Sequence, residues 1–278
     1  MPIQATSTAS DRASVELAFP EAPRVIYSKN PLWEVICQLR FPAILKIDSE
    51  IPASFQEKVR DSFPLSEEEE IVLPVDVPPE LVQLFKANRP TQLSRRTWRF
   101  ISEDNNWIIS LARDSATLST HKYLRWEEFR EKLALMCNAL VAEYRPSFIT
   151  RAGLRYRDLI IRSRLGLEDV PWAELLEKHI AGELSAQPLG EAIKEANHAV
   201  LAEFPEEKLK LGLRHGTGRH EGQDETGYVI DSDFFSEAKT EVTHVLEQLN
   251  FFNRMAGRLF RWCITERLHA AMEPQPVD

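Results

Sequence analysis

Apolar residues recur with two distinct periods along the first half of the chain. Within residues 32–41 every second position from Val35 onward is apolar, as in a strand with one buried face. Residues 52–64 start and end at proline and carry phenylalanine or valine at every fourth position, which predicts a short amphipathic helix. Residues 96–120 form two extended runs around the turn-forming triplet 104–106, so a hairpin is expected there.

A glutamate run and a proline-rich segment lie between the short helix and the hairpin. Residues 66–70 read Ser-Glu-Glu-Glu-Glu, which is typical of a solvated loop. Prolines interrupt residues 71–79, which predicts an edge strand or a connector because proline cannot donate a ladder hydrogen bond. Beyond the hairpin, residues 126–144 carry apolar side chains at helical spacing and end before a proline, so a long core-facing helix is expected.

A strand follows the long helix, and the second half of the chain, from residue 166, then repeats this order of patterns. Residues 151–158 predict a strand with arginines on one face and Ala152, Leu154, Tyr156 and Asp158 on the other. Residues 173–184 predict a helix, and three further strands are expected at 198–204, 209–215 and 226–235.

A stripe of apolar residues at intervals of three and four extends from about residue 237 to residue 272 and predicts one very long helix. The expected fold is therefore α+β, with two similar halves, each an antiparallel β-sheet backed by a long α-helix. Residues 1–27 are rich in alanine, serine, threonine and proline and predict a flexible N-terminal arm. Residues 28–165 and 166–278 are the expected halves.

Composition narrows the classes of partner. The chain has 278 residues and a formal net charge of -9, so nucleic acid is disfavoured as a partner unless a local basic patch exists. The three cysteines, Cys37, Cys137 and Cys263, lie far apart among apolar residues, which favours reduced core thiols and a cytoplasmic protein. No signal peptide and no membrane contact are expected, because no apolar run is long enough to span a bilayer.

Four segments, taken in order, resemble a known group of proteins. They read NPLWEVICQLRFP, AGLRYRDLI, YVIDSDFF and LNFFNRMAGRLFRWCITERLHAAMEP. The set resembles a sporadically distributed family of uncharacterised bacterial and archaeal proteins of roughly this length. The resemblance implies no known activity, and the scattered distribution of that family implies genes that travel, as in defence or toxin-linked islands. The family commonly has a small polar residue after its "LRY" unit, whereas Arg157 and Asp158 follow it here.

Five arginines are candidates for binding an anionic ligand or RNA. Three share one face of the strand at 151–158, and two more join them if their strands are neighbours: Arg151, Arg155, Arg157, Arg40 and Arg99. The alternative is that these arginines pair internally with glutamates 67–70 or with helix carboxylates. Internal pairing is the favoured interpretation, because most ion-pair networks are structural.

Two aspartates two residues apart, Asp231 and Asp233, would project from one face of a strand and could share a divalent cation. With Glu237 and Lys239 they resemble the carboxylate and lysine set of metal-dependent nucleases. The alternative is that the glutamate lies in the first turn of the long helix, where the helix dipole favours acidic residues.

Two histidines in a glycine-rich stretch, His215 and His220, are weak candidates for a metal site. The alternative is that this glycine-rich stretch is a flexible hairpin tip. No cofactor is expected, because the chain lacks the common phosphate-loop and dinucleotide-binding motifs.

Together these patterns favour a non-enzymatic binding or accessory protein, which recognises a protein partner or segment or forms a homo-oligomer. The family resemblance adds the expectation that it belongs to a mobile defence or toxin-linked system. The alternatives are the metal-dependent hydrolase and the anion or RNA binder.

Overall fold

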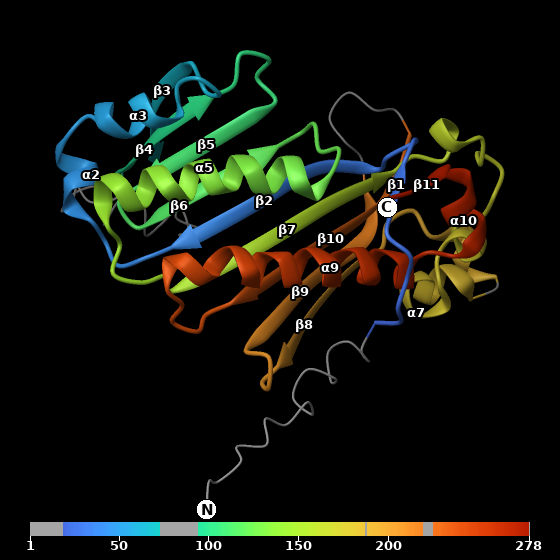
Figure 1. Cartoon of the computed structure of the whole chain (residues 1–278). Coiled ribbons are helices and arrows are strands. Elements are labelled where there is room, and N and C mark those ends of the chain that lie inside the picture. The colour runs from blue at the N-terminus through green and yellow to red at the C-terminus, as the bar shows by residue number, and fades with distance from the viewer. Residues whose placement is uncertain (1–18, 73–93, 187, 219–224, 278) are drawn as a thin grey trace, which may run out of the picture.

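A computed structural model describes residues 19–72, 94–186, 188–218 and 225–277 of the chain. Its centre is one antiparallel sheet of nine strands, in the order β3-β4-β5-β6-β2-β7-β10-β9-β8 (Figure 1). A second sheet pairs two short strands near the termini, β1 (Val25–Tyr27) and β11 (Pro274–Pro276). The α+β class with antiparallel sheets is therefore confirmed.

The strands of the large sheet are β2 (Leu32–Arg40), β3 (Leu65–Val72), β4 (Ser94–Ile101), β5 (Trp107–Ala112), β6 (Ser115–Thr120), β7 (Arg151–Ile160), β8 (Asn197–Phe204), β9 (Leu209–Gly218) and β10 (Gly227–Ser236). The helices are α2 (Leu45–Ser49), α3 (Ala53–Val59), α5 (Trp126–Tyr144), α6 (Trp172–Leu175), α7 (Lys178–Ala181), α8 (Leu189–Ala192), α9 (Val245–Cys263) and α10 (Glu266–Ala271).

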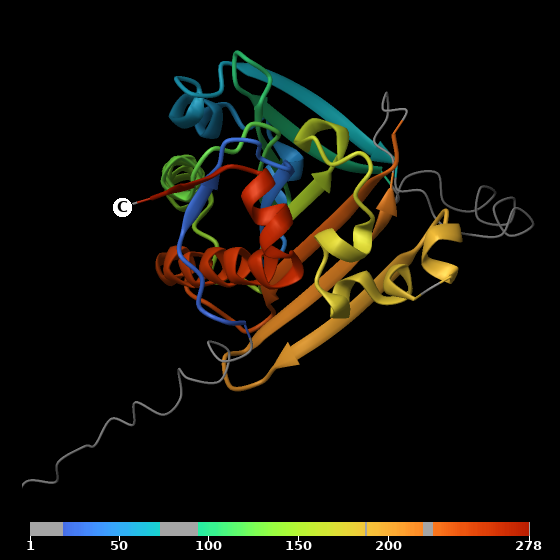
Figure 2. The ribbon, with the colours of Figure 1, turned by 90° about the vertical axis from the view of Figure 1, so that its right-hand side faces the viewer.

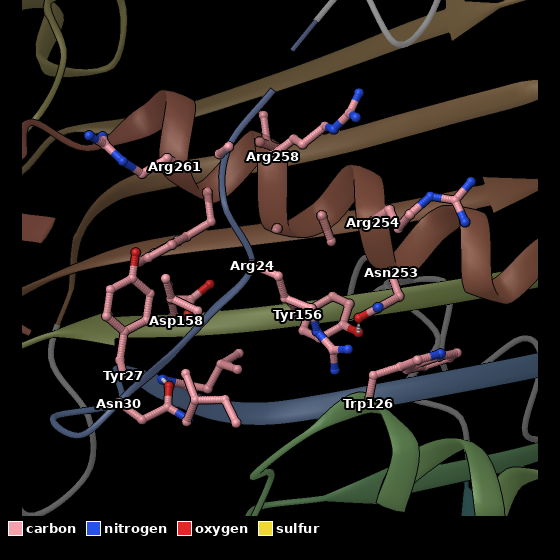
Figure 3. A pocket seen from close by; sticks show the side chains of 18 of the residues that line it. Arg24, Tyr27, Asn30, Trp126, Tyr156, Asp158, Asn253, Arg254, Arg258 and Arg261 are labelled. Atoms are coloured by element: carbon pink, nitrogen blue, oxygen red, sulfur yellow. Dashed lines mark hydrogen bonds between the residues drawn. The ribbon is translucent and has the colours of Figure 1, made fainter. Parts of the chain in front are cut away.

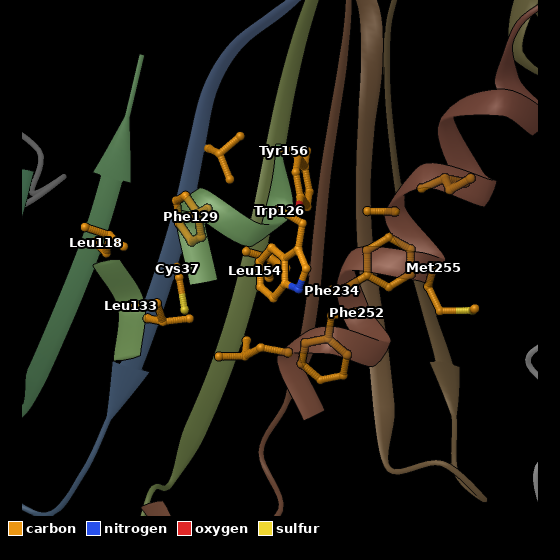
Figure 4. Close-up of a cluster of buried hydrophobic side chains, with 14 of the residues drawn as sticks. Cys37, Leu118, Trp126, Phe129, Leu133, Leu154, Tyr156, Phe234, Phe252 and Met255 are labelled. Carbon is orange, nitrogen blue, oxygen red and sulfur yellow. The ribbon is translucent and has the colours of Figure 1, made fainter. Parts of the chain in front are cut away.

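The two long helices, α5 and α9, cover the same face of the sheet (Figures 1 and 2). In β2 and β7 the residues that point to this face are buried from Val35 and Ala152 onward, whereas most of their neighbours along the strand are only partly buried. Phe129 and Leu133 from α5 and Phe252 and Met255 from α9 belong to one cluster of buried side chains over the central strands, with Trp126 and Leu154 between the two pairs (Figure 4). This layer is the main hydrophobic core, and the opposite face of the central strands carries polar side chains.

Several predicted elements are confirmed, with their faces. The expected helix at 126–144 coincides with α5, and the strands predicted at 32–41 and 151–158 are β2 and β7. Strands β8, β9 and β10 lie where alternation places them. Local periodicity is therefore enough to locate most of the elements that surround the core. The cysteines are free and buried, as expected.

Other expectations are wrong in instructive ways. The two halves contribute to one continuous sheet and do not form a sheet each. The predicted hairpin at 96–120 contains three strands, because the chain turns again between β5 and β6. The glutamate run lies in β3 at the edge of the sheet and is not a loop, and solvent reaches the side chains of Glu67, Glu68 and Glu69. Most of the proline-rich segment 71–79 lies outside the described residues.

The expected helix at 237–272 is broken. Strand β10 continues to Ser236, α9 starts at Val245, and the extended residue Ile264 separates α9 from α10. Ile264 makes a β-bridge to Leu176, so this break is fixed by tertiary contact. Residues 173–184 likewise form several short helical turns instead of one helix.

The predicted N-terminal arm is too long. Residues 1–18 lie outside the described residues, but Phe19 is buried against Trp262 and Phe234, and Val25–Tyr27 pairs with β11. Residues 19–27 are thus part of the folded body. We call residues 22–27 the N-terminal strap.

Candidate functional site

The arginines of β7 form an ion-pair network with carboxylates on the two neighbouring strands. Arg155 binds Asp231 through two hydrogen bonds of 2.6 and 2.5 Å, and Arg151 donates to Asp233 at 2.7 Å. Arg157 donates to Glu34 at 2.7 Å. The network therefore joins β2, β7 and β10, and internal pairing is the correct interpretation of these arginines.

The expected pairing with glutamates 67–70 holds for Arg99 but not for the arginines of β7. Glutamates 67 and 69 pair with Arg99, which lies on β4 and is separated from β7 by three strands. Arg40 is opposite Arg151 in the register but is exposed and donates to Gln38. Arg99 is therefore not part of the basic face predicted on β7.

The carboxylates of the candidate metal set are engaged by cations of the protein. Asp231 and Asp233 share a face, as predicted, but each accepts from an arginine. Glu237 pairs with Lys210 at 3.0 Å, and Lys239 lies over the Phe148 ring. The acidic residue at position 237 does not start a helix. These contacts tie the four residues into the sheet and its flanking turn.

His215 lies inside the protein and not at a hairpin tip. Its Nδ1 is 2.8 Å from the Tyr228 hydroxyl, and its ring stacks on His198. Burial lowers the pKa of His215 to about 4, so the imidazole is neutral at physiological pH. His220 lies outside the described residues. Within the described ranges no three His, Cys, Asp or Glu side chains are grouped as a metal site.

A cavity of about 310 Å³ lies between the sheet and α9. Its floor is formed by β7 and β10, one wall by α9, and another wall by the N-terminal strap, which runs across it (Figure 3). Its lining is largely apolar and aromatic, with Tyr27, Trp126 and Tyr156 among the larger side chains. Concave sites of this size and lining are where small organic molecules bind.

The Asp158 carboxyl lies in this cavity. The residue is 5% exposed, on the helix-covered face of β7 and opposite Ile230 in the register. Within the described residues its carboxyl makes neither a hydrogen bond nor an ion pair, although its backbone is paired in the sheet. Burial, together with the negative charge of Asp231, holds the pKa of Asp158 well above its usual value.

Hydrogen bonds hold the other polar groups of the cavity in place. The Tyr156 hydroxyl donates to Asn253 on α9 at 2.8 Å, and Trp126 Nε1 donates to Asn250 at 2.8 Å. On the other side, the Tyr27 hydroxyl is 2.8 Å from Nδ1 of His269. The walls of the cavity are therefore preorganised, and Asp158 is the carboxyl they surround.

The strap is fastened at both ends. Arg24 binds Glu127 on α5 with both terminal nitrogens at 2.7 Å, and the pairing of β1 with β11 holds the other end. The Arg24 guanidinium holds the pKa of Glu127 low, at about 2. Segments from both termini and both long helices thus build one site.

The sequence does contain a signal for Asp158, which the search for motifs missed. On the buried face of β7 the residue follows Ala152, Leu154 and Tyr156, where alternation calls for another apolar side chain. A carboxylate at such a position is costly to fold, so it marks a candidate site.

Comparisons with known proteins do not assign the site. No family model matches the chain, and no curated protein matches it. The resemblance to an uncharacterised family remains a prediction. No helix within the described residues has the length and apolar character needed to cross a membrane.

Proposed function

We propose that this chain is a non-enzymatic binding protein whose cavity beside Asp158 takes a small organic ligand. The observation that carries the proposal is a buried, unpartnered carboxyl in a preformed cavity with aromatic walls. Buried polar groups normally have hydrogen-bond partners. A buried polar group without a partner does not stabilise the fold. A ligand that completes the site gives this residue a role.

The test uses Gly257, which lines the cavity on α9. A Cβ added at this position meets nothing within 4 Å, so a larger side chain can fill space there without a clash. Gly257→Phe should block the cavity, and Gly257→Ala is the matched control that also removes the glycine from the helix but adds only a methyl group. Native mass spectrometry of protein purified gently from its own host should detect a bound small molecule in wild type and Gly257→Ala, but not in Gly257→Phe. A wild-type chain without bound mass, or a Phe variant that keeps it, contradicts the proposal.

A second candidate function is protein association at the edge strand β8. The other edge strand, β3, carries a run of glutamates, whereas the centre of β8 is uncharged and its Val200 and Leu201 are 51% and 64% exposed. Such an edge is a template for adding a strand, and charges normally protect against it. We propose a second copy of the chain as the partner, because antiparallel pairing about Val200 sets Ala199 opposite Leu201 and brings no like charges face to face.

Light scattering across a concentration series tests this association. Wild type should form a dimer, Leu201→Lys should remain a monomer, and Leu45→Lys, which changes a leucine 71% exposed on α2, should behave as wild type. A monomeric wild type at all concentrations contradicts the proposal, as does a Leu201→Lys dimer.

We also infer that the two halves are copies of one ancestral unit. From the centre outward the sheet runs β2-β6-β5-β4 in one direction and β7-β10-β9-β8 in the other. Each set is followed along the chain by a helix of 19 residues on the same face of the sheet. This shared order supports duplication more strongly than the weak sequence similarity between the halves does.

A further inference from the structure

The chemical character of the ligand follows from the surroundings of Asp158. A carboxylate that leaves water for an apolar cavity needs a cation or several hydrogen-bond donors, and otherwise keeps its proton. In the described structure the charge that acts most strongly on this carboxyl is Asp231, which is also negative. The cavity therefore lacks the positive charge that would stabilise an ionised Asp158.

The arginines at the rim do not supply that charge. The guanidinium groups of Arg254, Arg258 and Arg261 point away from Asp158 (Figure 3). Arg261 binds Glu266 and the Ile264 carbonyl, and Arg258 lies 3.4 Å from Glu21. Arg258 and Arg261 have these partners outside the cavity, and Arg254 lies over the Phe251 ring. None of the three is paired with Asp158, so a cation for this carboxyl has to come from a ligand.

The aromatic walls suit such a cation. Tyr27, Tyr156 and Trp126 line the space around the carboxyl, and ring faces attract ammonium groups in desolvated sites. A cavity of about 310 Å³ lies at the lower end of the range for organic ligands, so it fits a compact molecule.

We propose that the cavity binds a small organic cation, with an apolar body among the aromatic side chains and a primary ammonium group paired with Asp158. This inference rests on the proposed function of the cavity and adds the class of ligand. The ammonium group displaces the proton of Asp158, and the pair then carries no net charge. Binding is therefore coupled to the release of one proton.

The proton released on binding can be assigned to Asp158 by considering the other titratable groups around the cavity. Burial raises the pKa of Tyr27, Tyr156 and Cys263, so they keep their protons at neutral pH. Tyr123 also lines the cavity and keeps its proton, because burial raises its pKa to about 12, and Arg24 is paired with Glu127. Asp231 is paired with Arg155 on the other face, and burial lowers the pKa of His269, which contacts Tyr27. The variant Asp158→Asn separates the contribution of Asp158 from that of His269.

The experiment is calorimetric titration of the full chain with 2-phenylethylamine, 2-phenylethanol and 3-phenylpropionate, which share a ring and differ in charge. Near neutral pH, in two buffers of different ionisation enthalpy, the amine should bind at least about tenfold more tightly than the alcohol and release about one proton. Asp158→Asn should lose both the preference and the proton release. The carboxylate probe should bind weakest.

The outcomes separate the two proposals. If amine and alcohol bind equally without proton release, and Gly257→Phe abolishes both, the cavity is a ligand site but the cation proposal is wrong. Tighter binding of the carboxylate also overturns it. If no probe distinguishes wild type from Gly257→Phe, this inference fails, and the native mass spectrum decides separately on the cavity itself.

Discussion

The Asp158 carboxyl occupies a position on β7 at which the strand alternation calls for an apolar residue. Its neighbours on that face are buried, and it gains no compensating contact within the described residues. Residues that lower the stability of the fold and make no stabilising contact are typical of binding and catalytic sites. The loss of folding stability caused by the buried Asp158 carboxyl therefore indicates a functional residue, and this loss can be measured.

Asp158→Asn should stabilise the protein at neutral pH. The pKa of Asp158 is raised in the folded state, so the folded chain holds more protons than the unfolded chain above about pH 4, and wild-type stability falls as pH rises from there. The uncharged Asn side chain has no such loss. Urea denaturation should show a gain on the order of 1–3 kcal/mol near pH 7.5 and almost none near pH 4. An equal effect at both pH values would show that Asp158 is not protonated in the fold.

The arginines and aspartates of the ion-pair network could be placed on strand faces from the sequence, but their ion-pair partners could not be predicted. Alternation put Arg151, Arg155 and Arg157 on one face, and it put Asp231 and Asp233 on one face. That β10 lies beside β7, with Asp231 opposite Arg157, depends on strand order, which alternation does not contain. The cavity was still less predictable, because the strap and α9 come from opposite ends of the chain.

Strands β2, β7 and β10 are joined by more than backbone hydrogen bonds. Asp231 is the centre of the network, because it binds Arg155 and lies 3.8 Å from Nε of Arg157. Its side chain is 10% exposed, so a guanidinium left without it is poorly solvated. At the scale of elements, the network fixes the register of the three central strands.

Asp231→Ala should therefore destabilise the protein. The loss of one partner from a fully buried pair costs about 3–5 kcal/mol, and about 1–3 kcal/mol is expected here because the Arg155 side chain is 35% exposed. The matched control is Glu67→Ala, which removes an exposed partner of Arg99 and should cost no more than about 1 kcal/mol. Chemical denaturation of both variants gives the comparison. Similar small losses in both would mean that the network does not hold the sheet.

Predictions for the elements succeeded where the pattern was local. Helix α5 is an example, since its apolar spacing and the following proline define it within one segment. The break between α9 and α10 could not be predicted in this way, because Ile264 is an apolar, fully buried residue with no local signal for the end of a helix. It leaves the helix to bridge Leu176, a contact between distant segments.

In the whole molecule, the two faces of the nine-stranded sheet differ in their surroundings and in their side chains. The helix-covered face contains the core and the cavity, and the other face of the central strands carries the ion-pair network (Figures 1 and 2). The termini close the structure, since β1 and β11 pair beside the cavity. The account predicts that ligand binding involves the strap, α9 and β7 together, because each contributes a wall.

A crystal structure of the protein soaked with 2-phenylethylamine tests the central claim most directly. The account predicts density for the ring among Tyr27, Trp126 and Tyr156, with the nitrogen within hydrogen-bond distance of an Asp158 oxygen. The amine bound elsewhere, or lying in the cavity with its nitrogen turned away from Asp158, would contradict it.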